Sequence, residues 1–511
     1  CRWTRPPRTD RLLHMSDMNH HAAPSAHKRP SRAIGAFFGN RRVRLVGWIV
    51  VVVTFISGLV GGYHRGRHNQ PDWRDFSRES RSVWEDRAIP TGTSMFGYPP
   101  AAFFALWPFT VWSPPTLGLM AFVTVNAFAA VASCAILFRW WFVHSESAGQ
   151  VVPVDKGVFV WPLFLYVAHV QHVLQANQFT LLVLFFCVAG LTLLMHDRPW
   201  LGGLSLGIGT CLKVTPAVFL VYLCLRRQWK ALATMMLAIV MFNVVPSIWV
   251  FGFDGAVREH RAWLRRAGWY ANHRFIENPY LRIRRHGHNC SYSIVLARWL
   301  RPPTDARYQV ILHGDPPADQ IERARAALKP DETLVLDPMP TPGTTWSQTR
   351  DEIPDVPRFR LAHLSGGTVR FIWMITLAIP IVWLVIATYR NRHASADSPT
   401  RAAEAALWIM LMLWPTPMLR DYYLALALPA YVVVWRRVIT PAPSGRGRIL
   451  AAVALGICYL SVVGMGWKTG TFYGLHLATL AILAAACAWA WRAGAWIPTT
   501  DDRRYHPKTL A

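Results

Sequence analysis

Acidic residues are scarce in this 511-residue sequence, which has 28 Asp and Glu against 54 Lys and Arg and a formal net charge of +26. In a soluble protein such an excess would indicate a nucleic-acid partner. Here many of the basic residues stand in short segments between apolar stretches, such as RRQWK after Leu225 and YRNRH after Thr388. This placement is typical of the cytoplasmic loops of membrane proteins, so we expect no nucleic-acid partner.

Regular cysteine spacings are also missing. The eight cysteines are scattered, mostly inside apolar stretches, and no two of them have the C-x-x-C spacing. A disulfide framework or a zinc site is therefore not expected. We predict no metal and no bound cofactor.

Apolar stretches, by contrast, are abundant. Hydrophobic residues make up 53% of the chain, which contains 25 Trp, and several windows are long enough to cross about 30 Å of hydrocarbon. No repeat of fixed period is evident. We therefore expect an all-α polytopic membrane protein with about ten transmembrane spans, a pair of short re-entrant helices and outer-face loops.

The basic cluster Arg41, Arg42 and Arg44 predicts a cytoplasmic N-terminus, and the basic loops that follow predict a cytoplasmic C-terminus. The expected organisation is a disordered N-terminus (1–40), a membrane module (41–250) with an outer loop (62–116), a long extracytoplasmic loop with an interfacial helix (251–366), a second membrane module (367–492) and a cytoplasmic tail (493–511).

Residues 200–225 form an unusual apolar stretch. They are long enough for one crossing, but a single crossing would place the basic RRQWK segment outside. Gly207, Gly209, Lys213 and Pro216 interrupt the stretch. We expect two short helices that enter and leave on the cytoplasmic side, with Lys213 as a buried charge that needs a partner.

A Tyr-Pro-Pro sequence at residues 98–100 ends the outer loop. Prolines cannot continue a preceding helix and favour an extended residue before them. The motif predicts a sharp end of the loop at the membrane surface, with Tyr98 at the interface, and is interpreted either as the hinge of an active-site loop or as a plain helix start.

Four phrases of the sequence resemble one enzyme family when they are taken in order. They are DFSRESRSVWEDRAIPTGTSMFGYPPAAFFALWPF, the segment from QANQ at residue 175 to RRQWKA, GHNCSYSIVLARWL and LWPTPMLRDYYLALALP. Together they resemble the polyprenol-phosphate-dependent glycosyltransferases of the membrane GT-C class, specifically the mannosyltransferase family 87. Residues 302–362 have no counterpart in that pattern.

The resemblance implies an inner-membrane enzyme that moves a sugar, usually mannose, from a polyprenyl-phosphate carrier to a glycan or glycolipid hydroxyl on the outer face, with inversion. Its partners would be membrane lipid, the polyprenyl-phosphate sugar and the acceptor. Such a transfer needs a carboxylate to accept the hydroxyl proton and cations to receive the phosphate leaving group. The match places the base at Asp75, with Asp72 as the reserve.

The remaining site residues follow from the same phrases and from their charge. Candidates for the donor phosphate are Arg282, Arg284, Arg285, His288, Lys213 and Arg420. Candidates for substrate binding are Asp72, Tyr98, Asn177, Gln178, Asn289, Ser291, Asp421 and Tyr422. The family usually shows a Trp and one or two His where this chain has Arg420 and Asp421, which leaves the sugar and the acceptor open.

Each of these residues also has a plainer interpretation. Outer-loop acids are commonly solvated, basic clusters at a membrane surface attract anionic lipid, and Lys213 can pair within the bundle. Two other functions remain: a transporter or flippase of lipid-linked glycans, and a non-catalytic scaffold. A transporter should place several ionisable groups at mid-membrane, whereas most charges here lie in outer loops.

Overall fold

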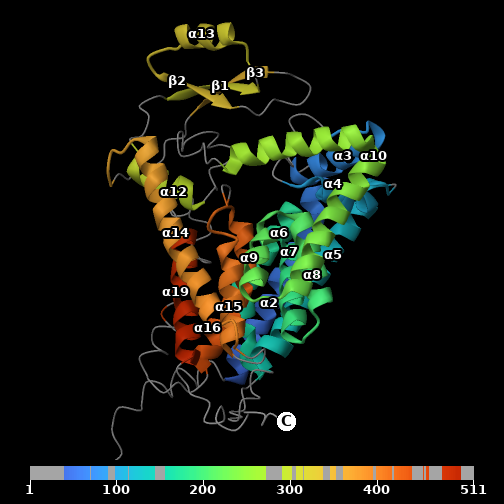
Figure 1. The fold of residues 1–511 in the computed structure, drawn as a ribbon, viewed down its shortest axis with the longest axis vertical. Coiled ribbons are helices and arrows are strands. Elements are labelled where there is room, and N and C mark those ends of the chain that lie inside the picture. The colour runs from blue at the N-terminus through green and yellow to red at the C-terminus, as the bar shows by residue number, and fades with distance from the viewer. Residues whose placement is uncertain are drawn as a thin grey trace, which may run out of the picture.

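The computed structural model describes most of the chain as a bundle of helices with a small sheet at one end (Figure 1). The described residues are 40–68, 71–89, 98–112, 114–143, 156–271, 291–301, 307–314, 316–337, 346–352, 361–394, 399–416, 419–439, 453, 456, 457, 459 and 475–495. Residues 1–39, on which the expected disorder falls, most of residues 440–474 of the second membrane module, and most of the expected tail lie outside them. We call the end of the bundle nearest the sheet the sheet end.

The first helix, α2 (Arg41–Arg67), begins where the Asn40 side chain accepts a hydrogen bond from the backbone N of Arg42 at 2.9 Å. Its apolar side chains are largely exposed, as Val53 shows at 59%. Such a surface suits lipid rather than water. On its other side α2 packs against α6 so closely that a Cβ at Gly62 would lie 2.5 Å from the backbone O of Leu174.

Two shorter helices follow at the sheet end: α3 (Pro71–Glu85) and α4 (Pro100–Thr110). α3 is amphipathic, with Trp73, Phe76 and Val83 buried. α4 starts directly after Pro99, which is extended at φ −67° and ψ 158°. The Tyr-Pro-Pro sequence therefore ends in a helix start, because proline is well suited to the first helical position.

The next segment forms the centre of the first half of the bundle. It consists of α5 (Pro115–Ile136), a π-helical turn (Leu137–Val143), a 3-10 turn (Lys156–Phe159), α6 (Val160–Ala176) and α7 (Thr180–Met195). The turn between α6 and α7 places Asn177 in the left-handed region at φ 52°, which Asn tolerates better than most residues. α5 and α7 pack together, and α6 packs on α2.

The expected pair of short helices is present as α8 (Pro199–Leu212) and α9 (Val218–Leu225), separated by an extended Lys213 and a 3-10 turn (Thr215–Ala217). α8 runs parallel to the start of α10, because Gly203 lies against Ala231 and Gly207 against Ala238. α9 must therefore return from Lys213 to the level at which α8 began. We call α8, the turn and α9 the hairpin, with Lys213 at its tip.

A single long helix, α10 (Trp229–Ala271), first runs along the bundle and then across its sheet end. Its first part has the length and hydropathy of a membrane span. At Gly252 the backbone takes φ 70° and ψ 173°, a conformation that side chains with a Cβ rarely adopt. The helix bends there, and its second part runs across the sheet end (Figure 1).

A small α/β unit, absent from the all-α expectation, lies beyond the helices. α12 (Tyr292–Leu300) leads to β1 (Tyr308–Gly314), α13 (Ala318–Ala326), β2 (Glu332–Asp337) and β3 (Trp346–Glu352). The strand order is β2-β1-β3, with β1 parallel to β2 and antiparallel to β3. Apolar strand residues such as Ile311 and Leu312 are buried, so the unit has a core of its own.

The second half of the bundle contains α14 (Gly366–Arg390), α15 (Pro399–Leu411), a 3-10 segment η7 (Asp421–Ala427), α16 (Leu428–Ile439) and α19 (Leu475–Ala495). The stretch from Leu424 to Leu428 is almost fully buried. It packs against α6 and α7 and therefore connects the two halves.

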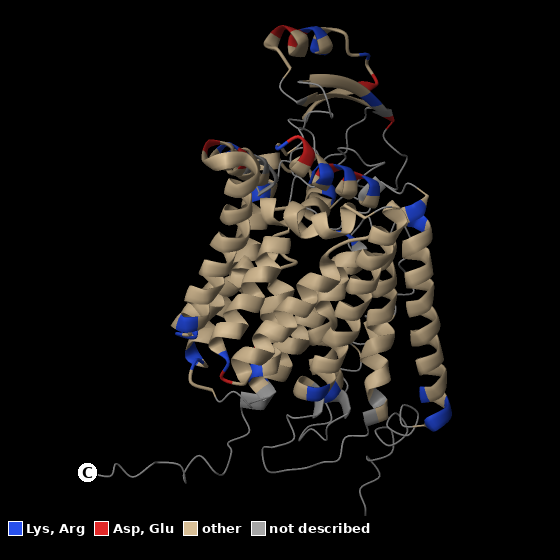
Figure 2. Ribbon diagram, turned by 90° about the vertical axis from the view of Figure 1, so that its right-hand side faces the viewer, with Lys and Arg blue, Asp and Glu red and all other residues tan. Residues whose placement is uncertain are grey.

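Five described helices have the length and hydropathy of membrane spans, and three further apolar helices are shorter. The five are Arg41–Arg67, Pro115–Trp141, Trp229–Arg265, Gly366–Arg390 and Leu475–Arg492. Lys and Arg gather at both ends of the bundle and are sparse along its middle (Figure 2). The protein is a helical multi-pass membrane protein, as its sequence predicts.

Candidate functional site

Asp75 lies on α3, at the sheet end of the bundle. Its side chain is 18% exposed, and its Oδ1 is 3.4 Å from an Arg78 nitrogen and 3.6 Å from Nε of Arg74. Both arginines are more than half exposed. Because ion pairs between such exposed groups are weak, Asp75 stays available to a ligand.

The buried face of α3 fixes where Asp75 stands. The next residue, Phe76, packs edge-on against Tyr98 at 5.7 Å between ring centroids and stacks on Phe179 at 6.3 Å. One turn later, the Ser80 hydroxyl donates to the backbone O of Phe103 at 2.9 Å. These contacts attach α3 to α4 and to the start of α7.

Tyr98 connects α3 to the hairpin. Its hydroxyl donates to Oε1 of Gln178 at 2.5 Å, and its ring centroid lies 5.9 Å from Nζ of Lys213. Two predicted site residues, Tyr98 and Gln178, are thus in direct contact although they are distant in the chain. Asn177 is also buried, but its amide points to the backbone O of Gly62 at 3.5 Å.

Lys213 is a buried cation at the tip of the hairpin. The residue is 7% exposed, and Nζ lies 3.3 Å from the ring centroid of Tyr423. Among the residues that the structure describes, Nζ has no hydrogen-bond acceptor. A charged side chain in the interior of a membrane costs about 2.5 to 3.5 kcal/mol by insertion scales. The site therefore favours an anionic ligand beside Nζ of Lys213.

Tyr423 belongs to the late phrase of the sequence, in the 3-10 segment η7. Its ring lies 4.7 Å from that of Tyr422, and its backbone N donates to the O of Arg420 at 2.9 Å. The predicted residues Arg420 and Tyr422 therefore stand next to the aromatic partner of Lys213. The side chain of Asp421 lies outside the described residues.

Ser291 lies at the start of α12, on the side of the second half of the bundle. It is fully buried, and its hydroxyl is 3.4 Å from that of Ser293. Its neighbour Tyr292 donates to Thr376 on α14 at 2.6 Å and contacts Trp414. These contacts place Ser291 at the α12–α14 interface. Arg282, Arg284, Arg285, His288 and Asn289, and the side chain of Asp72, lie outside the described residues.

Three aromatic residues of this cluster were not identified from the sequence: Phe76, Phe179 and Tyr423. Phe76 and Phe179 were indistinguishable from other apolar residues of amphipathic or membrane helices. Tyr423 could have been found from the sequence, because it directly follows the candidate Tyr422 and a buried lysine can pack against an aromatic ring. Among the described residues, no group of three His, Cys, Asp or Glu is placed to hold a metal.

The cluster therefore consists of Lys213, the aromatic rings of Tyr98 and Tyr423, and Phe76 of α3, which directly follows Asp75 in the chain. The model of glycosyltransferase family 87 matches residues 96–300, which include Tyr98, Gln178 and Lys213. Over these residues the chain is similar to glycosyltransferase family 87. Asp75 and Tyr423 lie outside the residues of this chain that the family 87 model matches.

The chain is also similar to several proteins with glycosyltransferase names. The chain is 31% identical over 138 residues to a polyprenol-phosphate-mannose-dependent alpha-(1-2)-phosphatidylinositol mannoside mannosyltransferase of Mycolicibacterium smegmatis, covering 26% of this chain and 31% of that protein. A mannosyltransferase of the same name from Mycobacterium tuberculosis is 31% identical over 152 residues, covering 28% and 35%. An alpha-(1->3)-arabinofuranosyltransferase of Corynebacterium glutamicum is 26% identical over 181 residues, covering 34% and 40%.

The chain thus spans about a third of the length of the two mannosyltransferases that it matches. No solved structure matches it.

Proposed function

We propose that the protein is an integral-membrane glycosyltransferase that moves a sugar from a polyprenyl-phosphate carrier to a hydroxyl of a lipid or glycan acceptor. The observation that carries this proposal is the buried amine of Lys213, which lies within the family 87 segment and has no acceptor among the described residues. A donor with a phosphate diester would bring the missing negative charge to Lys213. Mannose is the proposed sugar, because the two phosphatidylinositol mannoside enzymes have it in their names.

The reaction needs one bond to form and one to break. The acceptor oxygen attacks the anomeric carbon, and the bond between that carbon and the phosphate oxygen breaks, with its electron pair leaving on the phosphate. Asp75 takes the hydroxyl proton, and attack opposite the leaving group inverts the anomeric centre. Lys213, with Arg420 and the segment Arg282, Arg284, Arg285 and His288, would receive the phosphate charge.

Asp75 is better suited to the role of base than Glu79 and Asp86, which follow it in the chain. Glu79, one turn along, is only 1% exposed, so an acceptor hydroxyl cannot reach it easily. Asp86 is exposed beyond the end of α3, where its Oδ2 accepts a hydrogen bond from Ser82 at 2.6 Å. Asp75 alone of these three is both reachable and next to the ring that contacts Tyr98.

The sheet end is proposed to face the extracytoplasmic side. The turns at Arg198 and Arg226, and the start of α2 at Arg41, lie at the opposite end, and basic loops favour the cytoplasm. The ten crossings and two cytoplasmic termini expected from the sequence are consistent with this orientation. The proposed substrate-binding residues would then lie at the extracytoplasmic end of the bundle or just below its surface. They are Asp72, Tyr98, Asn177, Gln178, Asn289, Ser291, Asp421 and Tyr422.

The test is a transfer assay in membranes that contain the protein, with radiolabelled polyprenyl-phosphate mannose as the donor. Asp75→Asn should lower the rate about 10²- to 10⁴-fold, because a general base typically contributes that much. Asp86→Asn, just beyond the end of α3, is the matched control and should retain the rate. Undiminished transfer in Asp75→Asn would remove Asp75 as the base. If the wild type transferred no lipid-linked sugar and instead moved one across vesicles, the flippase alternative would replace the proposal.

A further inference from the structure

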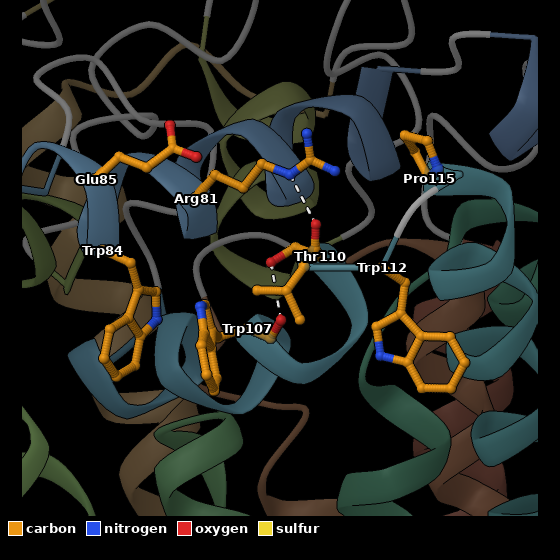
Figure 3. A pocket seen from close by; sticks show the side chains of 8 residues that line it. Arg81, Trp84, Glu85, Trp107, Thr110, Trp112 and Pro115 are labelled. Atoms are coloured by element: carbon orange, nitrogen blue, oxygen red, sulfur yellow. Dashed lines mark hydrogen bonds between the residues drawn. The ribbon is translucent and has the colours of Figure 1, made fainter.

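A polar cavity opens at the sheet end, between the C-terminal half of α3 and the end of α4. It has a volume of about 370 Å³ and is lined by Arg81, Trp84, Glu85, Trp107, Thr110, Val111, Trp112 and Pro115. Figure 3 shows three indoles below and beside the cavity, with Arg81 and Glu85 along its upper wall. The volume is typical of small-ligand sites, and none of the proposed site residues lines it.

Arg81 is held in place by only part of its guanidinium. Its Nε donates to the backbone O of Thr110 at 2.7 Å, which leaves the two terminal nitrogens for another acceptor. Glu85 lies one turn further along α3, a spacing at which opposite charges commonly pair. Within the described part of the chain, however, no salt bridge joins the two, and both line the cavity.

The indoles offer broad apolar faces beside these charges. Trp107 is 37% exposed and Trp112 is 49% exposed, while Trp84 packs against Trp107 with 4.5 Å between ring centroids. A hexose has an apolar face of C–H groups that fits an indole and a rim of hydroxyls that both donate and accept hydrogen bonds. Terminal arginine nitrogens and a carboxylate supply the complementary donors and acceptors.

Tryptophans also gather at membrane interfaces without binding anything. Trp249 of α10 serves as an internal comparison, since it is 76% exposed and contacts Trp84 edge-on at 5.6 Å, but does not line the cavity. An interfacial anchor needs no charged neighbour. The position of Arg81 and Glu85 beside Trp107 and Trp112 therefore distinguishes the cavity from a simple aromatic belt.

We propose that this cavity is a saccharide-binding subsite that holds a hexose of the acceptor glycan away from the reacting hydroxyl. The identity of the ligand as acceptor rests on the proposed function. Asp75 and Arg81 are six residues apart on one helix, which corresponds to about 9 Å along its axis. α3 would then present the base on one flank and the distal sugar on the other, so that longer acceptors bind more tightly than short ones.

The experiment uses the full-length protein in nanodiscs and a soluble α-linked mannose trisaccharide as the probe. A saturation-transfer NMR titration gives the Kd for the wild type and for Trp112→Ala and Arg81→Ala. Both variants should bind the trisaccharide about tenfold more weakly. Trp112 has an exposed ring, so its truncation tests the subsite even where Arg81→Ala fails to fold. Trp249→Ala is the matched control and should leave the Kd unchanged.

Transfer from polyprenyl-phosphate mannose is measured on the same preparations. Active wild type with an unchanged Kd in Trp112→Ala and Arg81→Ala overturns the subsite and leaves the function in place. Inactive wild type with the expected loss of binding overturns the function and leaves the saccharide subsite. A loss in Trp249→Ala equal to that in Trp112→Ala also overturns the subsite, since the effect is then a general one of the aromatic belt.

Discussion

A basic side chain is buried at each end of the hairpin, but only one of the two has an acidic partner. Where α9 ends, Arg226 pairs through two nitrogens with both carboxylate oxygens of Glu404, and its third nitrogen donates to the backbone O of Asn391 at 2.8 Å. At the tip, Lys213 contacts aromatic faces and has no acceptor among the described residues. The paired arginine is complete without a ligand, whereas the lysine is not.

We propose that the difference separates a structural charge, Arg226, from a ligand-binding one, Lys213. The Arg226–Glu404 pair joins the hairpin to the second half of the bundle and leaves no charge to satisfy. Lys213 keeps its unsatisfied charge at the end of the hairpin that faces Tyr98. Changes at the two ends should therefore affect different measurements.

The largest expected effect is on stability, at the paired end. Glu404→Ala leaves Arg226 buried without its counter-charge, because both side chains are only 1% exposed. Removing one partner of a buried pair typically lowers the free energy of unfolding by about 3 to 5 kcal/mol. A denaturant titration in micelles measures it. The double variant Arg226→Met/Glu404→Met should regain most of the loss; if it does not, the pair is more than a structural connection.

At the tip, Lys213→Met should affect activity and spare the fold. Hydrogen bonds to charged groups contribute about 1.5 to 3 kcal/mol, so the affinity for the lipid-phosphate donor should fall about 10- to 100-fold. The free energy of unfolding should change little, since removal of the buried charge offsets the loss of its contact with Tyr423. Lys230→Met, at the start of α10, is the control and should change neither quantity. A loss of stability like that of Glu404→Ala would show that Lys213 is structural.

The cation–π contribution of Tyr423 to the free energy of unfolding should be present only when Lys213 is present. Tyr423→Leu removes the aromatic face 3.3 Å from Nζ, and a desolvated cation–π contact is worth about 2 kcal/mol. Unfolding of the single variants and of Lys213→Met/Tyr423→Leu forms a double-mutant cycle that isolates this contact. Tyr423→Phe keeps the ring and should keep the coupling. A coupling energy near zero would contradict the cation–π interpretation.

The smallest effect concerns the hydroxyl of Tyr98. Tyr98→Phe removes the hydrogen bond to Gln178 and keeps the ring beside Lys213. The expected loss is about 1 kcal/mol of unfolding free energy, with little change in donor affinity. Equilibrium unfolding and donor titration check both parts. A drop in donor affinity as large as that of Lys213→Met would show instead that the hydroxyl contacts the donor.

Much of the membrane body was predictable because its constraints are local. The break between α8 and α9 follows from Gly207, Gly209 and Pro216 in an apolar run, and from the charge of the loop after it. The start of α4 follows from two adjacent prolines. In each case a few neighbouring residues decide the backbone, so the sequence is sufficient.

Pairings across the chain could not be read in the same way. Arg226 was counted with the basic loop RRQWK, but the structure buries it against Glu404, which lies 178 positions away. Tyr423 reaches Lys213 from the other half of the bundle. The sheet was missed because its two short apolar runs, in β1 and β2, become strands only by pairing with each other and with the polar β3.

The unit that carries the sheet enters and leaves the bundle at a single place. The backbone N of Leu361 donates to the O of Trp299 at 3.0 Å, and that of Leu364 to the O of Leu300 at 2.7 Å. The family 87 match ends at residue 300, just before the unit begins. Insertions whose two ends meet are tolerated by the host fold. The unit that carries the sheet can therefore be gained, lost or exchanged in evolution as a module, while the helices of the bundle keep their sequence and their chemistry.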